Sequence, residues 1–406
     1  MERLHIAFFG PTNSGKSTLV NAIAGQEVSL VSDVPGTTTD PVRKLIELPG
    51  LGPCVLIDTA GLCDDSLLGP ERQRRTRAIL DETDVAVLLC PSGDEAQVLP
   101  MVQEMGHWEQ NTPNTAPTVP KSGPLGAVPV IRVMPKADLG GEVPPGTIAV
   151  SALTGEGIPE LLERLAALRP ADHPFLTGRL VKPGDTVLLV MPQDSEAPKG
   201  RLILPQVQVL RELLDRGCIP VCCQPADLPA ALATLQAPPA LVITDSQAFG
   251  SVNAILPEQV PLTSFSVLLA ASKGDIDTFA EGAKAIGTLR PGDRVLIAEA
   301  CTHVPDTEDI GRVKIPALLQ KRVASRCHAG DPQGVSLPLR IDIAAGNDFP
   351  EDLSPYSLII HCGACVATAT LVRARIRRAR FSGVPITNYG IALAELTGIL
   401  NRISLP

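Results

Sequence analysis

The sequence predicts an α/β protein with three units, a larger one followed by two smaller ones, each built on a parallel sheet. Short apolar runs alternate with helical stretches along most of the chain, a pattern typical of parallel sheets covered by helices. Hydrophobic residues make up 44% and charged residues 19% of the 406 residues, so several packed cores can form. Residues 169–174 have the composition of a linker. We therefore expect units at 1–168, 169–262 and 263–406.

The alternation in the first unit is regular. The expected strands are Ile6–Phe9, Val55–Ile57, Val85–Leu89, Val130–Val133 and Ile148–Val150. The expected helices are Lys16–Ala24, Glu71–Glu82 and Ile158–Leu168. A polar stretch rich in Pro and Gly, at 103–129, is expected to form a surface loop.

The same alternation continues through the two smaller units. In the second, the expected strands are Thr186–Val190, Ile219–Cys222 and Leu241–Thr244, with helices at Gln206–Arg216 and Leu228–Leu235. In the third, the expected strands are Ser266–Leu269, Arg294–Ala298, Leu339–Ile343, Leu358–Ile360 and Pro385–Asn388. Because the second unit is small, apolar and poor in charge, we expect it to be stabilised by its own copy in a homodimer.

Charge and composition exclude several classes of protein. The net charge of −9 and the aromatic content of 3% argue against a nucleic-acid partner. No apolar run reaches the roughly 18 residues that span a membrane, so no membrane association is expected. The N-terminus leads directly into a strand, so we expect no signal peptide and a cytoplasmic protein.

A phosphate-binding loop follows the first expected strand. Residues 10–17 fit the pattern GxxxxGK[ST] at every fixed position, between a strand and a helix. Backbone N–H groups of such a loop converge on phosphate oxygens, Lys16 adds a positive charge, and the Ser17 hydroxyl reaches Mg²⁺. The expected nucleotide-binding residues of this loop are Gly10, Asn13, Ser14, Gly15, Lys16, Ser17 and Thr18, with Lys16 also catalytic.

Further motifs fall where a GTP-binding protein needs them. Asp58 ends a strand and begins an Asp-x-x-Gly motif, so that Asp58 would hold the magnesium shell and Gly61 would contact the γ-phosphate. The threonine-rich segment 36–40 is a candidate switch, with Thr38, or else Thr37, as the second hydroxyl on Mg²⁺. Its alternative is a solvated loop.

The guanine-reading region departs from the usual pattern. The motif Asn-Lys-x-Asp is replaced by a sequence that begins with Pro135, although Lys136 and Asp138 are kept. Asp138 can still pair with a guanine, and Ser151 and Ala152 match the short loop that contacts the base. The loss of the asparagine predicts a lower nucleotide affinity or a looser selectivity for guanine.

The third unit contains candidate metal ligands. Cys301 and His303 follow one expected strand, and Cys362 and Cys365 follow another, so the two groups lie at the carboxyl ends of parallel strands, where open α/β sheets place their ligands. Three thiolates and a histidine suit zinc or an iron–sulfur cluster. Gly363 is expected to permit the tight turn. The fourth ligand is His303, or His361, or the position is open.

The first unit resembles GTPases of the tRNA-modification and ribosome-assembly group, of the Era and TrmE type. The resemblance is carried by the segment Pro-Gly-Thr-Thr-Thr-Asp at 35–40, by Asn13 and by Asp-Thr-Ala-Gly-Leu at 58–62. It implies a P-loop GTPase domain in which Leu62 replaces a catalytic glutamine. It also implies a K⁺ ion beside Asn13, which supplies charge stabilisation during hydrolysis, so that Asn13 is expected to be catalytic together with Lys16.

Nearly the whole chain resembles the GTPase maturation factors of [FeFe]-hydrogenase. The resemblance is carried by residues 35–42, by Cys-Thr-His at 301–303 with the following Pro-Asp-Thr-Glu-Asp-Ile-Gly-Arg, and by His-Cys-Gly-Ala-Cys at 361–365. It implies that Cys301, Cys362 and Cys365 hold a [4Fe–4S] cluster. It further implies a dimeric, GTP-hydrolysing scaffold, which carries a transient diiron subcluster to apo-[FeFe]-hydrogenase and works with two radical-SAM maturases.

Two other functions account for parts of the sequence. An RNA-modification or ribosome-associated GTPase with a structural zinc module explains the first unit equally well, and an assembly protein with a vestigial nucleotide site is suggested by Pro135 alone. The helix after Cys365 carries Arg373, Arg375, Arg377, Arg378 and Arg380. These side chains form either a solvated face or a docking patch for an acidic partner.

Overall fold

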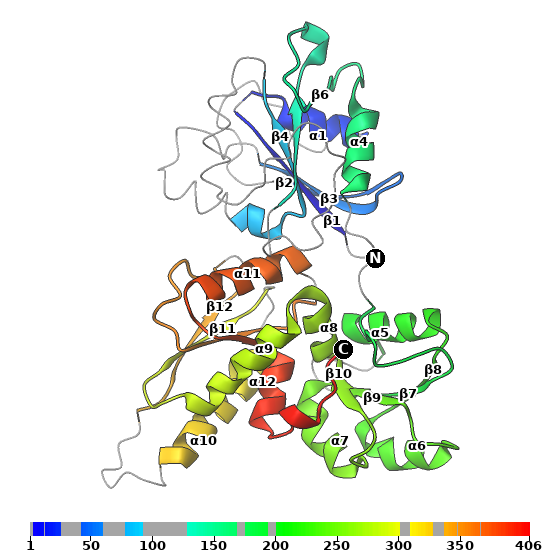
Figure 1. Cartoon of the computed structure of the whole chain (residues 1–406), viewed down its shortest axis with the longest axis vertical. Helices are drawn as coiled ribbons and strands as arrows, with labels where there is room; N and C mark the ends of the chain where they lie inside the picture. Colours follow the sequence, from blue (N-terminus) through cyan, green and yellow to red (C-terminus); the bar gives the residue numbers. More distant parts are fainter. Residues whose placement is uncertain are drawn as a thin grey trace. The chain divides into compact units, whose positions relative to one another are not determined.

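A computed structural model of the chain contains two compact units, Met1–Asp172 and His173–Pro406 (Figure 1). The name second unit is used from here on for His173–Pro406, which spans both of the smaller units expected from the sequence. The structure describes residues 3–11, 13–25, 42–59, 78–91, 128–168, 175–193, 200–300, 309–327, 337–346, 348–365 and 367–406. Residues 103–127 of the expected surface loop at 103–129 lie outside these residues. The same holds for the expected linker at 169–174 and for residues 71–77 of the expected helix Glu71–Glu82. Residues 78–82 are helical.

The first unit is a six-stranded sheet with the strand order β2-β3-β1-β4-β5-β6. The strands are β1 (Leu4–Phe9), β2 (Val42–Leu48), β3 (Gly52–Asp58), β4 (Val85–Leu89), β5 (Val130–Met134) and β6 (Thr147–Ala149). Two α-helices of this unit lie wholly within the described residues, α1 (Lys16–Ala24) and α4 (Ile158–Ala167). The α/β fold of this unit is therefore confirmed, with its strands and helices close to the expected positions.

The expectation of a purely parallel sheet in this unit is wrong at one edge. β2 runs antiparallel to β3, with Val42 opposite Asp58 and Leu48 opposite Gly52. A hairpin turn at 49–51 joins the two strands, so no helix separates them. A polar edge strand such as Val42–Leu48 lacks the continuous apolar run of the buried strands in a parallel sheet, so the alternation of strands and helices does not reveal it.

The second unit contains two four-stranded parallel sheets. One has the order β10-β9-β7-β8, and the other has the order β12-β11-β13-β14. The strands are β7 (Thr186–Val190), β8 (Ile219–Cys223), β9 (Leu241–Thr244), β10 (Leu262–Ser264), β11 (Arg294–Ala298), β12 (Arg340–Ala344), β13 (Leu358–His361) and β14 (Ile386–Asn388). The helices are α5 (Leu204–Asp215), α6 (Leu228–Thr234), α7 (Phe249–Ile255), α8 (Phe265–Lys273), α9 (Ile276–Ala283), α10 (Ile315–Cys327), α11 (Ala369–Phe381) and α12 (Tyr389–Leu396).

The expected strand Ser266–Leu269 is instead part of helix α8. The Ser264 side chain caps this helix by accepting a hydrogen bond from the Val267 N–H at 3.2 Å. A short apolar run does not distinguish a buried strand from a buried helix. Here the Ser264 cap in front of the run favours the helix. The strand that precedes it, β10, was not predicted.

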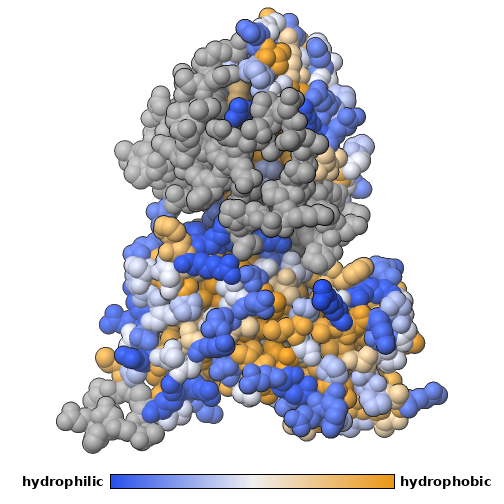
Figure 2. All heavy atoms as spheres, viewed as in Figure 1, coloured by the Kyte–Doolittle hydropathy of each residue, from blue (hydrophilic) through white to orange (hydrophobic). Residues whose placement is uncertain are grey.

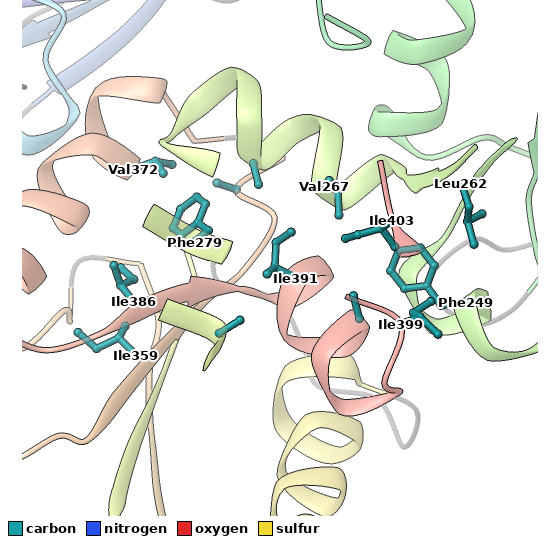
Figure 3. Close-up of a cluster of buried hydrophobic side chains, with 14 of the residues drawn as sticks. Phe249, Leu262, Val267, Phe279, Ile359, Val372, Ile386, Ile391, Ile399 and Ile403 are labelled. Atoms are coloured by element: carbon teal, nitrogen blue, oxygen red, sulfur yellow. The ribbon is translucent and has the colours of Figure 1, made fainter. Parts of the chain in front are cut away.

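One hydrophobic core joins the two sheets of the second unit. It contains Val242 from one sheet and Ile359 from the other, together with side chains of the helices between them. Figure 3 shows Phe279 of α9 and Ile391 of α12 within this core, and Phe249 of α7 near its other end. Each large apolar side chain buried in this way contributes about 1.5–3 kcal/mol to stability, so the two sheets support one another.

The last residues of the chain lie against the first of these sheets. Ser404 donates its N–H to the Leu262 carbonyl at 2.7 Å, and the Arg402 guanidinium bonds to the Val260 carbonyl at 2.6 Å. The C-terminal segment is thus held to β10 by backbone and side-chain bonds. Among the residues that the structure describes, no helix is both long and apolar enough to cross a membrane.

Candidate nucleotide and metal sites

The loop between β1 and α1 has the conformation that the phosphate-binding motif predicts. Gly10 adopts a φ of +154°, and a Cβ atom there would lie 2.9 Å from the Leu89 carbonyl oxygen, so no larger residue fits. The Lys16 ammonium is 5% exposed and donates to the carbonyls of Gly10 at 2.8 Å and Pro11 at 2.7 Å. The loop therefore curls around the lysine at the N-terminus of α1, where phosphate oxygens bind. Ser17 and Thr18 belong to the first turn of that helix.

The predicted magnesium-shell carboxylate lies next to this loop. Asp58 ends β3, is buried, and pairs in register with Phe8 of the neighbouring parallel strand. The Thr59 hydroxyl donates to the Phe8 carbonyl at 2.5 Å, which ties the start of the Asp-x-x-Gly motif to β1. Thr37, Thr38 and Gly61 lie outside the described residues, so their roles stay predictions.

The guanine-reading loop is linked to the phosphate-binding loop despite Pro135. Lys136 adopts a φ of +60°, and its ammonium donates to the Asn13 carbonyl at 3.2 Å. The Ser151 hydroxyl donates to the Asp138 carboxylate at 2.5 Å, so the two predicted base-contacting loops also meet, with Ala152 next in the chain. The asparagine of the usual motif links these two loops. Pro135 stands in its place here, and the link is made by Lys136, the following residue.

The two strands that lead into the cysteine motif, β11 and β13, are neighbours in the sheet. β11 and β13 are parallel, with Ala298 opposite His361, and the Cys362 N–H donates to the Ala298 carbonyl at 2.9 Å. The Cys362 sulfur accepts N–H bonds from Ala300 at 3.0 Å and Ala364 at 3.4 Å. Ala300, the residue before Cys301 in the sequence, therefore contacts the sulfur of Cys362. Cys301 and His303 themselves lie outside the described residues.

These donors suit a metal-bound thiolate. Cys362 and Cys365 are both partly exposed, and two backbone N–H groups are aimed at the Cys362 sulfur, where they favour negative charge. Within the described ranges, which omit 301–308, no three His, Cys, Asp or Glu side chains are gathered closely enough to hold a metal ion.

Lys273 holds the Cys-x-x-Cys loop in place. Its ammonium, at the end of α8, is 4% exposed and donates to the carbonyls of Ala364 at 2.8 Å, Cys365 at 3.2 Å and Ala367 at 2.8 Å. The tight turn itself depends on Ala364, which has a φ of +51°, and the expectation that Gly363 provides it is wrong. No sequence pattern identified Lys273, which is 91 positions from Ala364 along the chain.

His361 is engaged on both ring nitrogens. It is 1% exposed, and its Nε2 lies 3.0 Å from an Arg375 guanidinium nitrogen, which can only donate. The proton is therefore on Nδ1, which donates to the Cys362 carbonyl at 2.8 Å. Burial and the Arg375 charge lower the pKa of His361 to about 3, so the ring is neutral. With its Nε2 lone pair occupied, His361 is not available to bind a metal.

The segment that returns from residues 301–308 is anchored to the same strand end. Asp309 caps the π-helical turn Ile310–Lys314 by accepting the Arg312 N–H at 2.8 Å. The Arg312 guanidinium pairs with Glu299, which is buried directly after β11, at 2.7 Å. A Cβ at Gly311 would lie 1.9 Å from the Tyr389 hydroxyl, so only glycine fits beside this phenol. Burial raises the pKa of Tyr389.

The arginines of α11 do not form a single solvated face. Arg373 and Arg380 are exposed, and Arg377 and Arg378 are half-buried. Arg375 is 2% exposed and is among the largest fully buried side chains described. Neither alternative, a solvated face or a docking patch, therefore includes all five arginines, because the helix turns Arg375 into the protein interior.

The fold and the loop geometry define the first unit as a P-loop GTPase domain. Residues 5–119 match the family model described as 50S ribosome-binding GTPase. Residues 176–274 match the hydrogen maturase F dimerization domain, and residues 277–406 match the hydrogen maturase F tetramerization domain. These two models together cover more than half of the chain, which belongs to the hydrogen maturase F family.

Curated tRNA modification GTPases match about two fifths of this chain. The tRNA modification GTPase MnmE of Acidiphilium cryptum is 40% identical over 167 residues, which are 41% of this chain and 33% of that protein. MnmE of Parvibaculum lavamentivorans is 34% identical over 180 residues, or 43% and 36% of the two chains. The chain thus spans about a third of the length of these relatives, and the likeness concerns the GTPase domain alone.

Solved structures give weaker matches. Era of Aquifex aeolicus bound to GDP and aluminium fluoride is 19% identical, with a TM-score of 0.34 over 58% of this chain and 99% of Era. The NFeoB protein of S. thermophilus is 20% identical, with a TM-score of 0.31 over 42% of this chain and 65% of that one. Scores this low carry no argument about function.

Proposed function

We propose that this protein is a GTP-hydrolysing scaffold that binds a [4Fe–4S] cluster and carries a diiron subcluster precursor to apo-[FeFe]-hydrogenase. The observation that supports the proposal is the bond from the Ala300 N–H to the Cys362 sulfur, because Ala300 is the residue before Cys301 in the sequence. In this proposal Cys301, Cys362 and Cys365 hold three irons. Because the ring of His361 is engaged, the fourth ligand in this proposal is His303 or the position is open.

The nucleotide site is assigned to GTP, Mg²⁺ and K⁺. Lys16 and Ser17 bind the phosphates and Mg²⁺, Thr38 completes the magnesium shell, and Asn13 lies beside K⁺. Hydrolysis is expected to be slow because Leu62 stands where related GTPases carry a glutamine. We infer that the nucleotide times the exchange of partners, which are apo-hydrogenase and two radical-SAM maturases, in the cytoplasm. The domain division proposed for these tasks is 1–168, 169–262 and 263–406.

Iron content tests the cluster assignment directly. Anaerobically purified protein is expected to contain about four irons per chain and to show the EPR signal of a reduced [4Fe–4S] cluster after treatment with dithionite. The control is the same preparation after removal of iron by a chelator, which should lose the signal and regain it on reconstitution. One zinc per chain with no EPR signal would contradict the proposal, and would favour a structural zinc module.

A second copy of this chain is proposed to bind at the open edge of strand β8. This strand lies at the end of its sheet and exposes Ile219 and Cys222. Pro220 within it fits an edge position, because proline cannot donate to a neighbouring strand. Figure 2 shows hydrophobic residues among polar ones on the viewed face of the second unit. The family model for residues 176–274 is described as a dimerization domain.

The double variant Ile219→Lys/Cys222→Lys is expected to weaken this dimer about 30-fold, because two ammonium groups would have to be buried at the contact. Sedimentation at micromolar concentration should then report half of the wild-type mass. Leu153→Lys, which changes an apolar residue of the GTPase unit that is even more exposed than Ile219, is the control and should sediment as the wild type. Unchanged dimer affinity in the double variant would exclude this edge as the interface.

A further inference from the structure

A buried guanidinium lies beneath the cysteine motif. Arg375 is on α11, and its side chain is 2% exposed. The guanidinium carbon lies 4.9 Å from the centre of the Phe349 ring, a cation–π distance. A charge this deeply buried costs stability unless its donors are bonded, so its partners indicate its task.

The partners of Arg375 come from three neighbouring strand ends. One nitrogen, Nη1, donates to the Glu299 carbonyl at 3.2 Å, just after β11, and to Nε2 of His361 at 3.0 Å, at the end of β13. The other, Nη2, donates to the Gly346 carbonyl at 2.5 Å, two residues after β12. Since the sheet order is β12-β11-β13-β14, one side chain fastens three consecutive strands at the edge where the cysteines lie.

We propose that Arg375 is a positioning residue that sets the separation of the two halves of the cluster motif. Glu299 is two residues before Cys301, and His361 is directly before Cys362. The same guanidinium therefore bonds to the segments that lead into both halves of the motif, which we call its two arms. The inference rests on the proposed cluster. Its second consequence is electrostatic: a fixed positive charge one residue away from a ligand favours the more negative, reduced state of a thiolate-bound cluster.

Arginine is required for this role by its shape. Its planar fork carries donors that point in several directions at once, whereas a lysine ammonium is a compact point charge. The hydrogen bond that Arg375 donates to His361 also occupies the lone pair of Nε2, so this nitrogen cannot bind a metal. Arg375 therefore both spaces the arms and keeps this neighbouring imidazole from competing with the cysteines.

The test compares Arg375→Met with Arg378→Met. Arg378 is the matched control, because it lies on the same helix, stacks on the same Phe349 ring at 4.8 Å, and bonds to Pro350, which belongs to neither half of the motif. In reconstituted protein, Arg375→Met is expected to release iron to a chelator about 10- to 100-fold faster than wild type and to have a lower cluster reduction potential. Arg378→Met should stay within about two-fold in release rate, with an unchanged potential.

Both variants remove a stacked arginine, so a loss of thermal stability shared by the two does not count in favour of the proposal. If Arg375→Met releases iron at the wild-type rate and has the wild-type cluster reduction potential, the proposal is overturned. If that variant does not fold, Arg375→Lys takes its place, with an expected three- to ten-fold faster release, roughly the effect of one lost hydrogen bond. Arg375→Lys with wild-type behaviour would equally overturn the proposal.

A measurement on metal-free protein separates this inference from the proposed function. Alkylation of Cys362 and Cys365 by iodoacetamide, followed by mass spectrometry, is expected to be at least about ten-fold faster in Arg375→Met than in Arg378→Met, because the arms are no longer fastened. Equal rates would refute the positioning role even if wild-type protein binds a cluster. Faster alkylation in a protein that never takes up iron would refute the cluster and leave Arg375 with its role in spacing the arms.

Discussion

Replacing Cys362 by serine is expected to reduce the iron content from about four to less than one per chain and to abolish the EPR signal of the reduced cluster. A serine hydroxyl is a hard, weakly acidic ligand, whereas iron–sulfur clusters require soft thiolates. The substitution should leave the fold intact, because a serine oxygen can also accept the N–H bonds from Ala300 and Ala364 that Cys362 accepts. The measurement is iron analysis with EPR on anaerobically reconstituted protein.

The matched control is Cys222→Ser, which changes an exposed cysteine of the same unit on strand β8. It should keep the iron content of the wild type. Cys365→Ser and Cys301→Ser should behave like Cys362→Ser if the three thiolates act together. Retention of a wild-type signal in Cys362→Ser would show that the cysteine motif does not hold the cluster.

Replacing Lys16 by alanine is expected to weaken nucleotide binding about 100-fold and to slow hydrolysis about 1,000-fold. Lys16 is buried at the start of α1 and its ammonium lies inside the loop, so its loss removes a positive charge from the place where phosphate oxygens bind. Titration with a fluorescent GTP analogue and a phosphate-release assay measure the two effects. Hydrogenase maturation should fall with them, because we infer that the nucleotide times partner exchange.

Lys136→Ala gives a graded comparison within the same site. Its ammonium makes one exposed bond of 3.2 Å to the Asn13 carbonyl, so its loss should weaken GTP binding only about three- to ten-fold. Neither lysine variant should alter the iron content, because the two sites belong to separate compact units. Normal nucleotide turnover in Lys16→Ala would contradict the assignment of the loop, and normal maturation despite lost turnover would contradict the timing role.

The sequence predicted those elements in which local chemistry is sufficient. The phosphate-binding loop, helix α1 and strands such as Val85–Leu89 and Arg294–Ala298 occur as expected, because apolar periodicity and glycine geometry act over a few residues. The rules of parallel sheets predicted that Cys362 and Cys365 follow the carboxyl end of a strand, whereas the pairing of β11 with β13 is known only from the structure. The edge strand β2 and helix α8 were missed because a short polar strand and a short apolar run are ambiguous on local grounds.

What the sequence determined by itself is the kind of chemistry: a lysine in a phosphate-binding loop, an acidic residue at a strand end, and a pair of cysteine-containing segments. What only the tertiary structure decided is how these groups are held. Lys273 and Arg375 reach the cysteine motif from α8 and α11, and His361 is withdrawn from metal binding by a neighbour in space. The physical reason is that hydrogen bonds to buried carbonyls and ring nitrogens depend on which helices pack over the strand ends, and packing joins residues that are far apart along the chain.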